Sequence, residues 1–245
     1  MDNIQIVSLI DKFLDFYDSS ESITDFKEKF KIWEEKYGFA AVPPGDNRQE
    51  TVYKLFTENY SKYKKSLDKI KKFKPNEEKV NKILNEIKTL LAFEGCLDFV
   101  IIYFVGFFEN NAFVAPYDGG KLALCLPVEN NLSELNDDIL LAHELTHIVH
   151  NNILKSEAKW TRKLSFAILQ EGLAMKTSQC IVPGLSEYNY LASDEKWFNE
   201  CMKLKGKIID GIISYLDSED GEILFKFTTK SFFYKKRKTT LLKFL

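Results

Sequence analysis

The first half of the chain carries apolar residues at the three- and four-residue spacing that is typical of amphipathic helices. Residues 4–37 show this spacing in two stretches, and we interpret both as helices that are separated near residues 19–22. A lysine-rich helix is expected over about residues 50–73, and another over about residues 76–93. The pattern therefore predicts a helical N-terminal portion that covers residues 1–95.

From residue 97 the pattern changes to short apolar runs that are rich in β-branched and aromatic residues, which predict strands. The expected strands cover residues 97–106, 110–116 and 119–130. Helical spacing then returns over about residues 136–152, 163–179 and 194–216. We therefore expect one α+β domain over residues 1–245, with a core over residues 96–180 and a helical C-terminal portion over residues 181–245.

Composition excludes several kinds of partner and location. The formal net charge of −2 provides no field that would attract nucleic acid or an anionic membrane. The N-terminus lacks the basic region of a signal peptide, and the most apolar stretch, residues 99–108, is too short to span a bilayer. Four widely spaced cysteines form no CxxC pair, which favours reduced thiols. We therefore expect a cytoplasmic protein with neither a nucleic-acid nor a membrane partner.

The sequence HELTH, residues 143–147, is the strongest chemical signal in the chain. On a helix, His143 and His147 lie one turn apart on the same face, where two imidazoles can bind one Zn²⁺ at about 2.0–2.1 Å. Glu144 lies about 100° round the helix from His143. Its carboxylate can flank the metal without binding it, as a general base for a metal-activated water requires. This spacing predicts one catalytic zinc ion.

The third ligand is expected to be Glu171, in the sequence LQEGLAM on the next predicted helix. It follows His147 by 24 residues, so a helix–loop–helix hairpin can bring its carboxylate opposite the two histidines. Two histidines, one glutamate and a water make an open site of the catalytic kind, whereas a structural zinc site is closed by four protein ligands.

These four residues resemble the gluzincin branch of zinc metallopeptidases, and EGLA resembles a group of compact bacterial zinc proteases. The resemblance implies a zincin-like core, in which a small mixed sheet with an edge strand precedes the HExxH helix and the glutamate helix. In that fold an extended peptide substrate pairs with the edge strand. The matching stretch in this chain is residues 120–126.

Two positions depart from the thermolysin-like pattern. An aspartate that supports a histidine ligand is expected four residues after the glutamate, where this chain has Met175. Gln170 or a backbone carbonyl is then the expected acceptor. The chain also has no further histidine to stabilise the oxyanion, and other gluzincins use a tyrosine for this. Tyr188 and Tyr190 are the nearest downstream candidates.

The remaining histidine, His150, admits two interpretations. It lies on roughly the same helix face as His147, so it is either a residue that lines or supports the site or a plain surface histidine. As to function, we expect a zinc-dependent peptidase, without a distinction between endopeptidase and aminopeptidase. The alternative is a regulatory or sensing metalloprotein that cleaves one specific partner or is not catalytic. The sequence does not indicate an oligomeric state.

Overall fold

The computed structural model divides into two compact units. It describes residues 2–42, 47–109, 112–130, 132–155, 162–191 and 194–228. One unit combines residues 1–77 with residues 96–132, and the other combines residues 78–95 with residues 133–245. The prediction that the chain forms a single domain stays a prediction.

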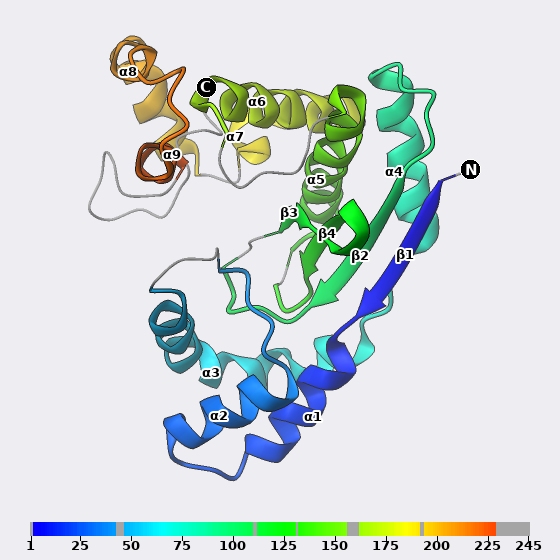
Figure 1. Ribbon diagram of the computed structural model, residues 1–245, viewed down its shortest axis with the longest axis vertical. Coiled ribbons are helices and arrows are strands. Elements are labelled where there is room, and N and C mark those ends of the chain that lie inside the picture. Colours follow the sequence, from blue (N-terminus) through cyan, green and yellow to red (C-terminus); the bar gives the residue numbers. More distant parts are fainter. Residues whose placement is uncertain are drawn as a thin grey trace. The chain divides into compact units, whose positions relative to one another are not determined.

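The first unit holds a four-stranded mixed sheet and three helices (Figure 1). Its elements are β1 (Asn3–Ser8), α1 (Ile10–Ser20), α2 (Phe26–Lys36), α3 (Arg48–Lys72), β2 (Asp98–Phe104), β3 (Phe113–Pro116), a 3₁₀ turn (Asp118–Gly120) and β4 (Leu122–Pro127). The strand order is β1-β2-β4-β3, in which β1 and β4 run parallel to β2 and β3 runs antiparallel to β4. Among the described residues, the mixture of helices with a small mixed sheet confirms the α+β prediction.

Two sequence predictions about the sheet were wrong. Residues 3–8 form β1 instead of the start of a helix, and β1 pairs with β2 in a register that places Ile4 opposite Phe99. Residues 120–126 were expected to include an edge strand, but β4 lies inside the sheet between β2 and β3. Among the described strands, the edges of the sheet are β1 and β3.

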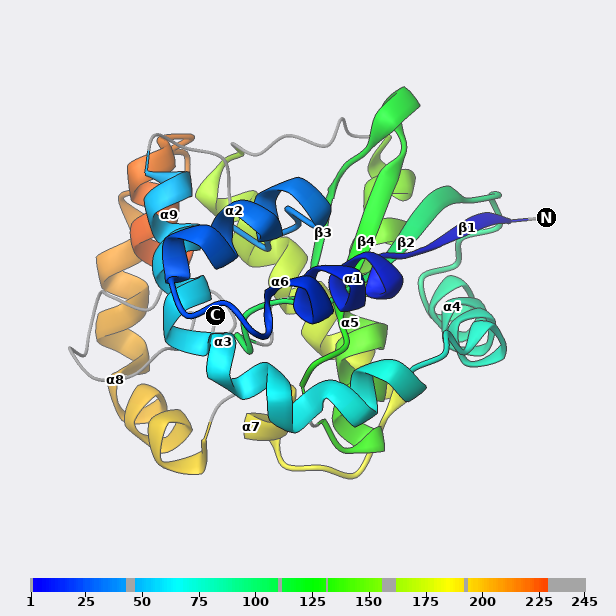
Figure 2. The ribbon, with the colours of Figure 1, turned by 90° about the horizontal axis from the view of Figure 1, so that it is seen from below.

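The helices α1, α2 and α3 contact one another (Figure 2). Their buried side chains form an aromatic core. Phe13 contacts Tyr63 edge to face with ring centroids 4.9 Å apart, and Phe30 stacks on Trp33 at 5.3 Å. Such contacts add to the free energy that burial of large rings already contributes. This core explains why apolar residues at helical spacing so clearly marked these three segments in the sequence.

The buried carboxylate of Glu129 connects the segment that follows β4 to the segment that follows β2. Glu129 accepts hydrogen bonds from the backbone N–H groups of Gly106 at 2.8 Å and Phe108 at 3.1 Å. A Cβ atom at Gly106 would lie 2.9 Å from the carboxylate, so this close approach requires glycine. Burial raises the pKa of Glu129, and the two backbone donors together with the charge of Lys69 oppose that effect.

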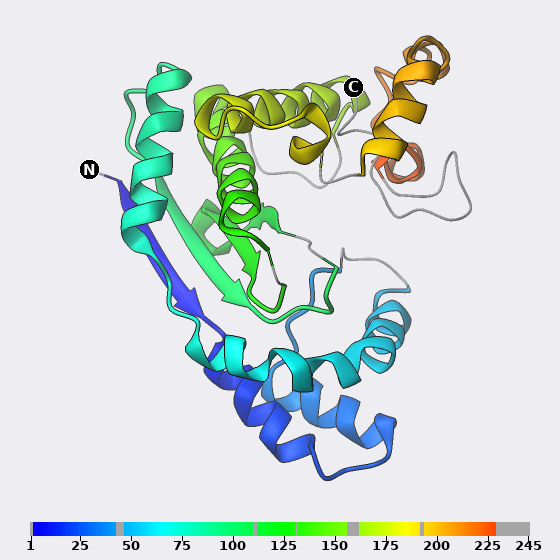
Figure 3. The same cartoon turned by 180° about the vertical axis from the view of Figure 1, so that it is seen from behind.

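The second unit is helical in the part of the chain that the structure describes (Figure 3). Its elements are α4 (Glu77–Leu90), α5 (Glu134–Leu154), α6 (Leu164–Ile181), α7 (Glu187–Tyr190), α8 (Glu195–Ile213) and α9 (Gly221–Thr228). Helices α6, α8 and α9 share an apolar core that includes Ala167, Ile208 and Phe227. The predicted helices of this unit are confirmed to within a few residues. The end of the predicted C-terminal portion, residues 229–245, lies outside the described residues.

Helix α5 begins at a side-chain cap and is tied to α4 by ion pairs. The Ser133 hydroxyl accepts the N–H of Asn136 at 3.3 Å, so Ser133 is the cap, a few residues before the expected start of the helix. Lys79 on α4 pairs with Asp137 at 2.7 Å and also with Asp138. No helix among the described residues is both long and apolar enough to span a bilayer.

Candidate metal centre

Helix α5 carries the HELTH sequence in a buried setting. The helix is buried on several of its sides, because six of its own apolar side chains are buried: Ile139, Leu141, Ala142, Leu145, Ile148 and Val149. His143 and Glu144 are each only 5% exposed. Polar side chains in such surroundings are stabilised only when they have partners, because the loss of their hydration is costly.

Helix α6 crosses α5 and supplies the partner for the two histidines (Figures 1 and 3). Nε2 of His143 lies 3.3 Å from Oε2 of Glu171, and Nε2 of His147 lies 3.6 Å from Oε1 of the same carboxylate. The two Nε2 atoms are 3.2 Å apart. The structure therefore brings together the three residues that the sequence predicted as ligands.

These distances fit a shared zinc ion. Two atoms that occupy corners of a tetrahedron around zinc, each at about 2.0–2.1 Å, lie about 3.3–3.4 Å from each other. The two imidazole nitrogens lie 3.2 Å apart, and each lies 3.3 or 3.6 Å from a different oxygen of the carboxylate, so the three groups are close enough to share one ion. Among the described residues, His143, His147 and Glu171 form a group whose ligand atoms all lie within 4.8 Å of one another, so they could hold a metal ion. Three protein ligands would leave one tetrahedral position for water or substrate.

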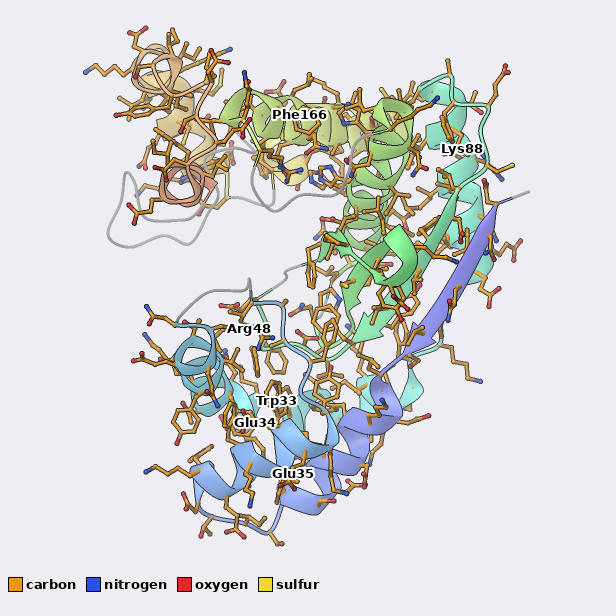
Figure 4. The ribbon with its side chains drawn as sticks, viewed as in Figure 1. Trp33, Glu34, Glu35, Arg48, Lys88 and Phe166 are labelled. Carbon is orange, nitrogen blue, oxygen red and sulfur yellow. The ribbon has the colours of Figure 1, made fainter. Side chains whose placement is uncertain are left out.

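His150 is buried, which rules out the interpretation as a surface histidine. It is 7% exposed, and its ring stacks on Phe166 with centroids 6.1 Å apart. Figure 4 labels Phe166 on α6. Its Nδ1 atom is buried without a hydrogen-bond partner among the described residues. Burial lowers the pKa of His150 and so favours the neutral ring. His150 therefore packs between α5 and α6, one turn beyond His147.

Gln170, which immediately precedes Glu171, is hydrogen-bonded to two polar residues that the sequence analysis did not single out. Gln170 was expected to support a histidine; the structure shows its amide donating to Asn151 at 3.2 Å and accepting from Arg162. Asn151 follows His147 by four residues on α5, and this spacing was the available signal in the sequence. No local pattern marked Arg162.

The two predicted tyrosines differ in their surroundings. Tyr190 is 4% exposed and packs with Ile139 and Val182. Its hydroxyl donates to the carbonyl of Val182 and accepts the N–H of Leu185 at 3.3 Å. Tyr188 is half-buried on α7.

Comparisons with known proteins agree with this chemistry. A family model with the description "Putative zinc dependent peptidase (DUF5700)" matches residues 8–244. No curated protein and no solved structure gave a match. Because the family model covers nearly the whole chain, including the HELTH sequence and Glu171, the chain belongs to the family that carries this description.

Proposed function

We propose that this protein is a zinc-dependent peptidase that hydrolyses peptide bonds with His143, His147 and Glu171 as metal ligands. The observation that carries the proposal is the convergence of two imidazoles and one carboxylate at separations of 3.2–3.6 Å. Membership of the family supports the same conclusion. One zinc ion is the expected cofactor, and peptides or proteins are the expected substrates.

In this proposal Glu144 is the general base. A zinc ion in the site would polarise the peptide carbonyl and lower the pKa of a bound water towards about 7. Glu144 accepts the proton of the attacking water and then donates it to the leaving amine. Its position next to His143 on α5 and its low exposure, 5%, support this role.

The oxyanion donor is proposed to be Tyr188, with Tyr190 as the alternative. The hydroxyl of Tyr190 already bonds to Val182 and Leu185, so it is less free to reach a substrate. A hydroxyl that donates to the developing oxyanion contributes about 10²–10³-fold to turnover in comparable sites. Tyr188→Phe is therefore expected to lower kcat more than Tyr190→Phe does when both variants remain folded.

The substitution Glu144→Gln tests the proposal most directly. The variant is expected to keep its zinc and to lose hydrolysis of a mixed peptide library by about 10²–10⁴-fold, which is the usual contribution of a general base. Zinc content by elemental analysis and cleavage by mass spectrometry are the two measurements. Glu134→Gln, at an exposed position in the first turn of the same helix, is the matched control and should remain active.

The result also separates the proposal from its alternative. Wild-type protein that binds zinc but cleaves no peptide in the library would contradict a general peptidase and favour a regulatory metalloprotein with one specific partner. Wild-type protein that cleaves peptides at the same rate with and without zinc would contradict both.

A further inference from the structure

A chain of three polar side chains joins α5 to α6 beside the candidate ligands. The guanidinium of Arg162 donates to Oε1 of Gln170, and Nε2 of Gln170 donates to Oδ1 of Asn151 at 3.2 Å. Asn151 lies one helical turn after His147, and Gln170 immediately precedes Glu171. These hydrogen bonds therefore link the two helices next to the positions where each carries a candidate ligand.

The hydrogen bonds of Gln170, the middle residue of the three, depend on the register of the two helices. Gln170 is 1% exposed, and both ends of its amide are used in hydrogen bonds. A shift of α6 along α5 by one residue would leave a buried amide without partners, which is costly. The bonds of Gln170 therefore select the register in which Glu171 faces His143 and His147.

Arg162 also lies close enough to Glu171 for the two charges to interact. It lies half-buried just before α6. Burial lowers its pKa, and the nearby carboxylate of Glu171 opposes that effect. Arginine nevertheless keeps its charge in proteins, and its planar guanidinium offers five donors. One guanidinium can therefore hold Gln170 while its charge attracts the carboxylate of Glu171.

We propose that Arg162 is a positioning residue for the metal group, which holds α6 in register through its hydrogen bond to Gln170. The inference rests on the zinc site of the proposed function. It goes beyond that function because it assigns the metal affinity in part to a side chain that does not itself bind the metal. Residues that support ligands in this way typically contribute about 10–100-fold to metal affinity.

The test is metal binding by the purified, metal-free full-length protein. Zinc affinity is measured by competition with a chelator, and the absorption spectrum of the Co²⁺-loaded protein reports the ligand geometry. The variants are Arg162→Met and Arg162→Gln, which remove the charge, Arg162→Lys, which keeps it, and Gln170→Met, which breaks the chain. Lys163→Met is the matched control, because Lys163 is the next residue and pairs with exposed Asp217.

Both neutral Arg162 variants are expected to bind zinc about tenfold more weakly and to show a changed Co²⁺ spectrum. The loss of helix register outweighs the repulsion between guanidinium and ion that the substitution removes. Arg162→Lys should recover most of the affinity, and Lys163→Met should match wild type. The double variant Arg162→Met/Gln170→Met should lose little more than either single variant, since both act in one chain. Thermal unfolding of each metal-free variant confirms that it is folded.

Three results would overturn the inference. These are unchanged or tighter zinc binding in the neutral variants, an Arg162→Lys variant as weak as Arg162→Met, and fully additive losses in the double variant. Failure of wild-type protein to bind zinc at all would instead overturn the proposed function, so the two failures are distinguishable.

Discussion

Glu171 differs from the two histidines in that it reaches the metal group from another helix. His143 and His147 share one face of α5 through their spacing alone, whereas Glu171 depends on how α6 crosses α5. Its carboxylate is close to both rings, at 3.3 and 3.6 Å. Its removal therefore tests whether the third side chain is a ligand.

We expect Glu171→Gln to weaken zinc binding by more than about 100-fold, which exceeds the usual effect of a merely supporting residue. The neutral amide lacks the charge that a carboxylate contributes to a divalent ion. Chelator competition on the metal-free protein is the measurement. Glu187→Gln, at an exposed position on α7, is the control. A Glu171→Gln variant that binds zinc as tightly as wild type would contradict the assignment of Glu171 as a ligand.

Single residues also mark how far sequence reasoning could reach. The ligand group was predictable because His143 and His147 need only helical spacing, and Glu171 lies in a recognisable local context. The burial of His150 and the hydrogen bond of Arg162 to Gln170 were not predictable. Both depend on which face of α6 meets α5, and no pattern along one segment contains that information.

At the scale of elements, long periodic helices were easier to predict than short strands. Helices α3, α5, α6 and α8 repeat their apolar spacing over several turns, so the sequence identified them. Strand β1 has six residues and runs into α1 after a single residue, so its short alternation was read as part of the helix. The order of the strands was missed because β4 inserts between β2 and β3, and that choice depends on contacts distant in sequence.

Glu129, between the ends of β2 and β4, provides a pH-dependent test of this sheet. Because burial raises its pKa, the folded state keeps the proton to a higher pH than the unfolded state does. The protonated form of Glu129 therefore stabilises the folded state fully at pH values below the ordinary pKa of a glutamate. This stabilisation is lost as the pH rises through the raised pKa. Glu129→Gln cannot titrate and lacks this loss.

We expect the stability of wild type relative to Glu129→Gln to decline as the pH rises from about 4.5, the ordinary value for a glutamate. Urea unfolding of both proteins at a series of pH values measures the difference. The variant Glu58→Gln, at an exposed position on α3, should follow wild type throughout. A difference that stays constant or grows with pH would show that the hydrogen bonds from Gly106 and Phe108 outweigh burial.

At the scale of the whole molecule, all three candidate ligands belong to the second unit. A ligand that binds only the folded state stabilises it by about 2.7 kcal/mol at a concentration 100 times its Kd. Such stabilisation slows local opening mainly in the helices that the ion joins.

Saturating zinc is therefore expected to slow amide hydrogen exchange in α5 and α6 more than in the strands of the first unit. Hydrogen exchange read by mass spectrometry measures this, with His143→Ala as the variant that should lose the effect. Equal protection of β2 and α5 by zinc would contradict the expectation.

The division of the chain between its units has a consequence for biosynthesis. Asn3 of β1 pairs with Asp98 of β2, which is synthesised 95 residues later. Lys79 of α4 bonds to Asp137 of α5, which is synthesised 58 residues later. The sheet of the first unit therefore lacks a strand until β4 has been synthesised, and the second unit lacks its central helices until α5 and α6 have been synthesised. Fragments that end before β4 should accordingly expose unpaired strand edges and aggregate. Nascent chains of that length are therefore expected to bind chaperones more than longer ones do.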